Sequence, residues 1–388
     1  MWRAMGVPLF DIRLEEADRR AVDEVLRSGW LTMGPRTEEF EQRFAAHLGA
    51  RHAVAVSSGT AALHLAFLAA GVGPGDEVVV PAITFVATAN AVRYCGATPV
   101  LADVRGIDDF GIDPEDVERR ITPRTRAVCA VHYAGYAAPL EELTVLCREH
   151  GVALIEDAAH SPSAQAAGSP RKLGTWGLAG AFSFFSNKVL SCGEGGLLAT
   201  DDDEVAAIAR SRRSHAMTSG TWDRHRGHAD SYDVVDLGFN YRIDEIRAAL
   251  LISRLAGLEA DIARRREIVA AYREQLSEIP EITFPYGDEE VSRSSCYVMP
   301  TIVEDPALRG PLRRLMQERH GVQTSVLYPS IAELTAYRDA VDHALPRSEQ
   351  IAHGELTLPL FGQMSDDQQR TVLAALREGL AELDAADL

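Results

Sequence analysis

Lysine is almost absent from this chain of 388 residues. Of its 39 lysine and arginine side chains, only Lys172 and Lys188 are lysines. Acidic residues number 57, so the formal net charge is −18, which disfavours nonspecific attraction to nucleic acid or anionic lipid. No run of about 18 apolar residues is present, as a membrane-spanning helix requires, and the first residues do not resemble a signal peptide. We therefore expect a cytoplasmic protein with no nucleic-acid or membrane partner.

Cysteine is also scarce, and no two cysteines form a C-x-x-C pair. This spacing predicts neither a zinc ribbon nor a disulfide framework, and we expect no metal site. Most of the five are expected to be small buried hydrophobic residues, although Cys192 lies among glycines and could be exposed. They are Cys95, Cys129, Cys147, Cys192 and Cys296.

Short apolar segments alternate with helical patterns through the first two thirds of the chain, which predicts an α/β fold with a mostly parallel sheet. Helical patterns lie at 60–70, 84–94, 138–150 and 202–214, and a further one lies at 14–29. Seven segments are predicted to be strands, at 53–57, 77–82, 98–103, 127–133, 153–158, 181–185 and 196–200.

The last third of the chain reads as a smaller α+β unit. A helical pattern without proline covers 242–277 and is expected to connect two domains. Beyond it the pattern predicts a strand at 296–303, a helix at 306–321, a strand at 322–328 and a closing helix at 366–383. We expect a large domain over residues 1–255 and a small domain over residues 256–388.

Lys188 lies in the segment SFFSNKVLSCGEGG (183–196), where it follows an aromatic strand and precedes a glycine-rich turn. A neutral lysine amine at the bottom of a cleft can form a Schiff base with a carbonyl cofactor, and desolvation lowers the lysine pKa for that purpose. A solvated loop lysine is the alternative for this segment taken alone.

Two further segments carry candidate chemistry. Asp157 ends the apolar strand in ALIEDAAHS (153–161), at the sheet edge where α/β proteins bind ligands, and an aspartate there can hold a pyridinium nitrogen. Glu156 should point to the opposite face because side chains alternate along a strand. The turn SSGT (57–60) begins an uncharged helix, whose amino end can bind a phosphate or simply be capped by serine.

These three segments, together with GVPLFDIRL, PAITFVATANAV and LGFNYRIDEIRAAL (237–250), resemble the DegT/DnrJ/EryC1/StrS family of pyridoxal-phosphate sugar aminotransferases. The resemblance spans nearly the whole chain. It implies the aspartate-aminotransferase fold (fold type I), with a large cofactor domain containing a seven-stranded sheet and a small C-terminal domain. It also implies a homodimer whose active sites lie between the subunits.

The resemblance assigns roles to individual residues. Lys188 would bind pyridoxal 5'-phosphate and, once released, move the proton between substrate and cofactor carbons, with pyridoxamine 5'-phosphate as the intermediate form of the cofactor. Asp157 would pair with the ring nitrogen, and His160 would contact the phenolic oxygen. Phe85 would stack on the pyridine ring.

The same resemblance implies a phosphate site that two subunits share. Ser58, Gly59, Thr60 and Ser183 would hold the phosphate from one subunit. Asn240, in the turn GFNYR, would reach it from the neighbouring subunit.

Lys188 also separates two branches of the family, since the deoxysugar dehydratases have histidine at that position. We therefore expect transamination, in which glutamate or glutamine donates the amino group and a keto sugar, of the nucleotide-linked kind that the resemblance implies, accepts it. Many members have histidines in a small-domain segment where this chain has Leu327 and Ala332. The acceptor could thus be an aminocyclitol precursor, and a dehydratase or a non-catalytic regulatory protein are further alternatives. The acceptor contacts that we expect are Thr32, Met33, Gly34 and Tyr328.

Overall fold

The computed structural model describes residues 6–219, 227, 231–338, 341 and 343–386. Seven strands form one large sheet in the order β1-β9-β8-β7-β6-β2-β3. Strand β9 runs antiparallel to both of its neighbours, and the other pairs are parallel, as the sequence predicted. The strands are β1 (His52–Val56), β2 (Glu77–Pro81), β3 (Thr98–Ala102), β6 (Thr125–Val131), β7 (Ala153–Asp157), β8 (Ala179–Ser183) and β9 (Gly196–Thr200).

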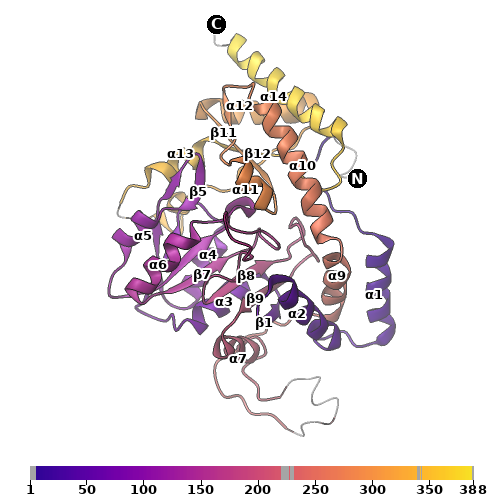
Figure 1. Ribbon diagram of the computed structural model, residues 1–388, viewed down its shortest axis with the longest axis vertical. Coiled ribbons are helices and arrows are strands. Elements are labelled where there is room, and N and C mark those ends of the chain that lie inside the picture. Colours follow the sequence, from indigo (N-terminus) through magenta and orange to yellow (C-terminus); the bar gives the residue numbers. More distant parts are fainter. Residues whose placement is uncertain (1–5, 220–226, 228–230, 339–340, 342, 387–388) are drawn as a thin grey trace.

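Helices cover both faces of this sheet (Figure 1). Successive residues of β2 point to opposite faces, so that Val78 and Val80 contribute to one apolar cluster and Val79 to another. The first cluster includes residues of α3 (Gly59–Ala69), α4 (Ala87–Tyr94) and α7 (Asp203–Arg212). The second includes residues of α5 (Pro114–Arg120) and α6 (Leu140–His150). A short hairpin of β4 (Val104–Gly106) and β5 (Asp109–Ile112) lies beside the sheet.

The amino-terminal helices pack against the start of the connecting helices. Helices α1 (Glu16–Ser28) and α2 (Pro35–Leu48) both contact α9 (Glu245–Leu255), and α10 (Leu258–Leu276) leads from there to the second unit (Figure 1). That unit has a three-stranded sheet in the order β10-β11-β12. Its elements are β10 (Ile282–Thr283), α11 (Asp288–Arg293), β11 (Met299–Val303), α12 (Pro306–His320), α13 (Pro346–Gly354), β12 (Glu355–Leu358) and α14 (Asp366–Ala386).

Two predictions for the last third of the chain were wrong. The single helix expected at 242–277 is broken at Gly257, because glycine is a weak helix former and its N–H bonds to Arg254, three residues back. The strand expected at 322–328 is not formed, because Val322 pairs with Val7 whereas Ser325 pairs with Thr357. Strands β10 and β12 instead complete the small sheet. The division into domains at residue 255 stays a prediction.

All five cysteines are buried, Cys192 included. Among the described residues, no helix has the length and apolar character that crossing a membrane requires. The same residues contain no group of three or more His, Cys, Asp or Glu side chains arranged to hold a metal ion.

Candidate active site

The residues singled out in the sequence converge where the parallel strands end. Asp157 ends β7, Ser183 ends β8 and Ser58 follows β1 at the beginning of α3. Phe85 lies beyond the end of β2, and Lys188 follows β8 by five residues. A parallel sheet brings the carboxyl ends of its strands to one edge, so residues separated by more than a hundred positions become neighbours there.

Lys188 lies in a tight turn after β8, in which its own N–H donates to the carbonyl of Phe185 at 2.8 Å. Its ammonium group lies over the ring of Tyr297, 4.3 Å from the ring centroid. Part of the side chain is open to solvent, yet burial of the amine lowers the pKa of Lys188 to about 7, against the opposing effect of the Asp157 carboxylate. A substantial fraction of the amine is therefore neutral near pH 7, as nucleophilic chemistry requires.

Asp157 is buried and accepts two hydrogen bonds. Thr88 donates to Oδ2 at 2.8 Å, and the N–H of Ala159 donates to Oδ1 at 3.2 Å. Burial raises the pKa of Asp157, whereas these two bonds and the charge of Lys188 lower it. Thr84 lies 3.0 Å from the Thr88 hydroxyl and supports its orientation. The site thus offers a buried, hydrogen-bonded carboxyl that a cationic ring nitrogen would keep ionised.

Glu156 points to the opposite face of β7, as strand alternation predicted. It accepts hydrogen bonds from the N–H groups of Gly174, Trp176 and Gly177 at 2.6–2.8 Å, and from His132 at 3.0 Å. This carboxylate fixes the loop before β8 and is fully buried. Its contacts are structural, and they hold in place the strand that carries Asp157.

His160 is buried among aromatic rings and has a defined tautomer. The N–H of Ala134 donates to Nδ1 at 3.1 Å, and Nε2 lies 3.2 Å from the Tyr328 hydroxyl. Burial and the charge of Lys188 place the pKa of His160 well below its ordinary value, so the ring is neutral. Since Nδ1 accepts, the proton lies on Nε2. The ring also stacks on Tyr297 with centroids 4.3 Å apart.

The amino end of α3 has the shape of a phosphate cradle. Ser58 caps the helix by accepting from the N–H of Ala61 at 3.1 Å, and Gly59 and Thr60 are the first helical residues. A Cβ on Gly59 would lie 2.9 Å from the Cβ of Ser183, so only glycine allows this approach. The helix dipole and the first N–H groups favour an anion at this position.

Phe85 is exposed over 53% of its surface, which is unusual for an aromatic residue at a sheet edge. Its ring lies 5.5 Å from that of Tyr328 at an angle of 49°. Beside Lys188, the amide oxygen of Asn187 is buried without a hydrogen-bond partner. An open aromatic face, a neutral lysine, a buried carboxyl and an anion cradle are together the features that pyridoxal phosphate requires.

The other predicted residues have contacts outside this cluster. Asn240 is exposed and pairs with Ser214 in an isolated bridge, so within one chain it contributes to the surface. Gly34 begins α2, and its N–H donates to Glu245 at 2.9 Å. Thr32 and Met33 precede it in the same loop, with Thr32 exposed and Met33 partly buried. The hydrogen bond of this loop is thus to α9, and its role as an acceptor contact stays a prediction.

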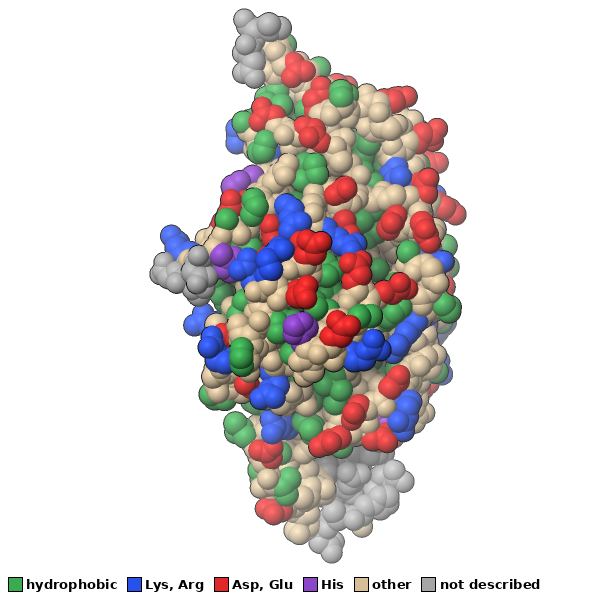
Figure 2. Space-filling view, turned by 60° about the vertical axis from the view of Figure 1, so that its left-hand side comes forward, with side chains coloured by type: hydrophobic (Ala, Val, Ile, Leu, Met, Phe, Trp, Pro, Cys, Tyr) green, Lys and Arg blue, Asp and Glu red, His purple; other side chains and the backbone are tan. Residues whose placement is uncertain are grey.

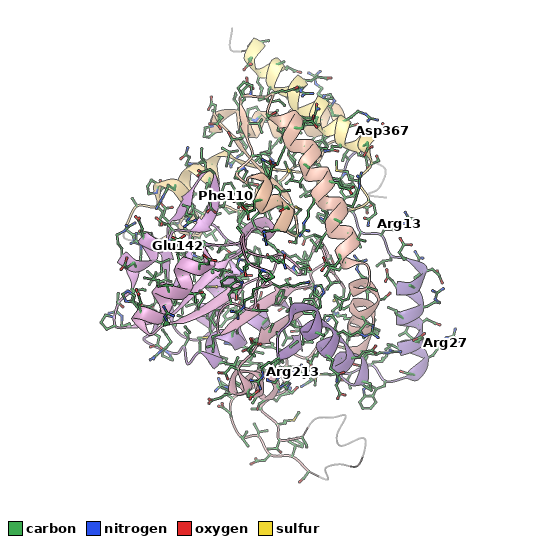
Figure 3. The ribbon with its side chains drawn as sticks, in the orientation of Figure 1. Arg13, Arg27, Phe110, Glu142, Arg213 and Asp367 are labelled. Carbon is green, nitrogen blue, oxygen red and sulfur yellow. The ribbon has the colours of Figure 1, made fainter. Side chains whose placement is uncertain are left out.

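Three residues of the cluster were missed by sequence reasoning. Tyr297 lies under Lys188 and against His160 but comes from the small unit, more than a hundred residues later. Thr88 lies three residues after Phe85, at the beginning of α4, and this spacing could have indicated that Thr88 belongs to the site. Tyr133 is buried with no partner for its hydroxyl, and it packs against Phe110, which Figure 3 places near the centre of the molecule.

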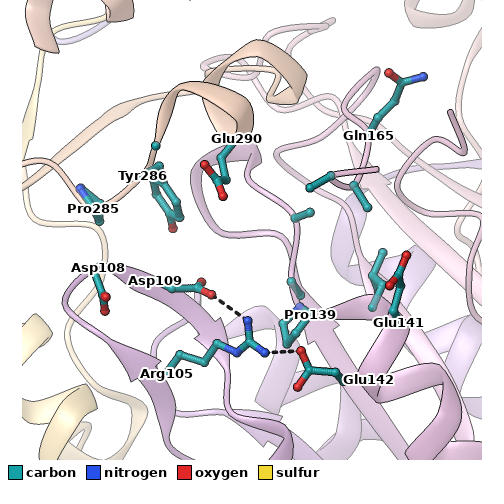
Figure 4. Close-up of a pocket in the computed structure, with 16 residues that line it drawn as sticks. Arg105, Asp108, Asp109, Pro139, Glu141, Glu142, Gln165, Pro285, Tyr286 and Glu290 are labelled. Atoms are coloured by element: carbon teal, nitrogen blue, oxygen red, sulfur yellow. Dashed lines mark hydrogen bonds and ion pairs between the residues drawn. The ribbon is translucent and has the colours of Figure 1, made fainter. Parts of the chain in front are cut away.

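A separate polar pocket of about 250 Å³ lies between the β4–β5 hairpin, the segment 137–142 and residues 285–290 of the small unit (Figure 4). Arg105 crosses it and pairs with Asp109 at 3.3 Å and with Glu142. The residues that line it include none of those around Lys188. The pocket is therefore distinct from the site that carries the chemistry.

Comparisons with known proteins agree with this geometry. The model of the DegT/DnrJ/EryC1/StrS aminotransferase family matches residues 13–377. The spore coat polysaccharide biosynthesis protein SpsC of Bacillus subtilis is 36% identical over 366 residues, which cover 92% of each chain. The crystal structure of the aminotransferase TlmJ from Streptoalloteichus hindustanus is 36% identical, covers 98% of this chain and 99% of its own, and has a TM-score of 0.88.

A third relative shows the cofactor. NtdA from Bacillus subtilis was solved with bound pyridoxamine phosphate and is 28% identical, covering 94% of this chain and 82% of its own, with a TM-score of 0.83.

Proposed function

We propose that this chain, which belongs to the DegT/DnrJ/EryC1/StrS aminotransferase family, transfers an amino group from glutamate or glutamine to a nucleotide-linked keto sugar in amino-sugar or antibiotic biosynthesis. It is a pyridoxal-phosphate-dependent aminotransferase of fold type I. We propose the identity of the amino donor, the class of the acceptor and a cytoplasmic location for the protein. The observation that carries the proposal is the neutral, partly enclosed amine of Lys188 beside Asp157 and Tyr297.

Lys188 has two tasks in this proposal. Its neutral amine would hold the carbonyl group of the cofactor, and the same nitrogen would take the proton from the donor carbon that bears the amino group. A fully charged ammonium could do neither. The enclosure that lowers its pKa to about 7 therefore serves both tasks at neutral pH.

When bound, pyridoxal phosphate supplies an electron sink that stabilises the negative charge left on that carbon. Asp157 would hold the ring nitrogen of the cofactor in its protonated form, which would strengthen this sink. Thr88 and the N–H of Ala159 keep the carboxylate aimed at this position. The Nε2–H of His160 faces Tyr328 and orients it at the edge of the same site.

We further propose that two copies share each site. Asn240 is exposed and follows a stretch whose apolar side chains are also exposed, with Tyr232 at 56%, Val234 at 53%, Val235 at 64% and Leu237 at 73%. Several exposed apolar side chains in one short stretch are typical of a protein interface. In the homodimer Asn240 would complete the phosphate site of the neighbouring subunit, next to Ser58, Gly59, Thr60 and Ser183 there.

The acceptor side of the site combines one tyrosine with an apolar segment. Tyr328 lies at its edge, and Leu327 and Ala332 give that segment apolar character where related proteins often have histidine. We propose the loop of Thr32, Met33 and Gly34 as a further contact for the acceptor. An aminocyclitol precursor is therefore the alternative acceptor, and the same enzyme assay tests it.

The test begins with the visible spectrum of the purified protein. We expect a yellow protein that borohydride labels at Lys188 and not at Lys172, the only other lysine, so that one peptide map assigns the modified residue. Glutamate and glutamine are then added separately, and one of them should bleach the unreduced enzyme. Keto sugars and keto cyclitols are finally screened against the bleached form. A protein that binds no added cofactor would contradict the proposal.

A further inference from the structure

Glu355 is a fully buried acid that the reaction described above does not use. It begins β12, and none of its surface reaches solvent. One carboxyl oxygen, Oε2, accepts from the backbone N–H of Leu327 at 2.7 Å, and the other accepts from the hydroxyl of Thr357. Burial raises the pKa of Glu355 to about 8. Burying an acid costs free energy unless the acid is hydrogen-bonded. The bond with Leu327 is one of two that offset this cost.

That contact lies on the segment that leads into the active site. Ser325 is bonded to Thr357 in both directions, at 3.1 and 2.9 Å, which ties the segment to the small sheet. Six residues later the N–H of Ile331 donates to the carbonyl of Ala82, beyond the end of β2, at 2.8 Å. Between these two ties the N–H of Leu327 is bonded to a side chain, that of Glu355. The carboxyl of Glu355 thus sets the path of the segment as it crosses from one unit to the other.

The residue after Leu327 is Tyr328, which enters the cofactor site. Its hydroxyl lies 3.2 Å from Nε2 of His160, and its ring lies 5.5 Å from that of Phe85. A shift of the Leu327 peptide would therefore move the Tyr328 ring against both partners. Displacements of about 1 Å in positioning groups can lower an enzymatic rate about 100-fold.

We propose that Glu355 is a positioning residue, which holds the Leu327 peptide so that Tyr328 is placed against His160 and Phe85 at the edge of the cofactor and acceptor site. The inference rests on the proposed aminotransfer reaction for its consequence, but the placement itself is a property of the cofactor-free chain. Because burial raises its pKa to about 8, most of the Glu355 carboxyl is protonated at neutral pH while Oε2 accepts from the N–H of Leu327.

The neutral form defines a pH dependence. The charged and titratable groups that face the carboxyl are Arg309 and Arg313 from α12, and the hydroxyls of Tyr133 and Tyr328 from the site itself. As pH rises through about 8 the carboxyl ionises. A negative charge then appears next to the Leu327 peptide, behind Tyr328. We expect the environment of the bound cofactor to change in that pH range.

The experiment compares E355Q, E355L and T357V with the wild type. Glutamine keeps an acceptor for Leu327 and stays neutral, and leucine removes the acceptor. T357V removes the hydroxyl that bonds to the other oxygen of Glu355 and leaves the acceptor for Leu327 in place. In the cofactor-free protein, hydrogen exchange of the peptide covering 325–331 should become about tenfold faster in E355L alone. In the loaded protein at pH 7, visible circular dichroism should be unchanged in E355Q and T357V and reduced in E355L.

Two further measurements separate positioning from general stability. The dichroism of the wild type should show a step near pH 8 that E355Q lacks. E355L, introduced as a single change, should lower the rate of amine transfer to the acceptor about tenfold. In protein that already carries Y328F, the same change should lower that rate less than about twofold, because the effect passes through Tyr328. Equal effects of E355L and T357V, or a step that persists in E355Q, would overturn the inference. A colourless wild type would overturn the proposed function instead, and hydrogen exchange would still decide the role of Glu355.

Discussion

The amine of Lys188 should react as a neutral nucleophile near pH 7, which can be measured without cofactor or substrate. Burial lowers its pKa from 10.5 to about 7. At pH 7 about half of the amine is then neutral, whereas an ordinary lysine with a pKa of about 10.4 is neutral in roughly one molecule in 2,500. We expect labelling of Lys188 by formaldehyde and a mild borohydride to rise with pH through about 7 and to level off near pH 8.

The chain provides its own reference for this assay, because Lys172 is the only other lysine and is ion-paired with Glu259 at 3.1 Å. Peptide mapping reports both rates from one sample. Asp157 opposes the effect of burial, so D157N should move the midpoint for Lys188 to lower pH and leave the labelling of Lys172 unchanged. A midpoint at pH 9 or above for Lys188, or an upward shift in D157N, would refute the electrostatic reasoning.

Four other variants test separate features of the site. Lys188→Ala should fold and bind pyridoxal phosphate without a covalent bond while losing turnover, and full activity in a turnover assay would contradict its role. Thr88→Val removes a bond that lowers the pKa of Asp157, so titration should show cofactor binding about tenfold weaker, a loss of about 1.5 kcal/mol. Glu245→Ala leaves four buried or half-buried donors at the start of α2 unpaired, and urea unfolding should show a loss of about 2–5 kcal/mol. Because the pKa of Glu355 is raised in the folded state, the wild type loses stability as pH rises from about 4.5 to about 8. At pH 8 Glu355→Gln should therefore be more stable than the wild type by on the order of 1–3 kcal/mol. Equal stability of the two proteins would be evidence against burial as the cause of the raised pKa.

Sequence patterns predicted the large sheet well because its signals are local. Strands β2 and β6 are short apolar runs bounded by turn residues, and α3 is an uncharged helix that follows a capping serine. The small sheet was predicted less well. β10 has only two residues, and β12 follows a helix without a turn, so neither leaves a pattern that a window of residues can detect.

Site residues that lie in a recognisable sequence segment could be predicted. Site residues that only folding brings next to that segment could not. Lys188 and Asp157 each lie in a distinctive segment that the family resemblance picks out. Tyr297 has no such segment, and its place under Lys188 depends on how α10 brings the small unit back over the sheet edge. The bond from Glu355 to Leu327 likewise joins residues whose proximity follows from packing alone.

Burial of His160 also assigns a direction to the hydroxyl of Tyr328. Because the N–H of Ala134 occupies Nδ1, the single proton of the neutral ring lies on Nε2 and is donated to the Tyr328 oxygen. A hydroxyl that accepts in this bond keeps its own proton for another partner. That proton is directed away from His160, at the edge of the site where the acceptor would bind. Tyr328 should therefore donate a hydrogen bond to an oxygen of the acceptor. This contact would allow the site to bind a polyhydroxylated ketone, although the residue beside Tyr328 is Leu327 and not the histidine that the family resemblance implies.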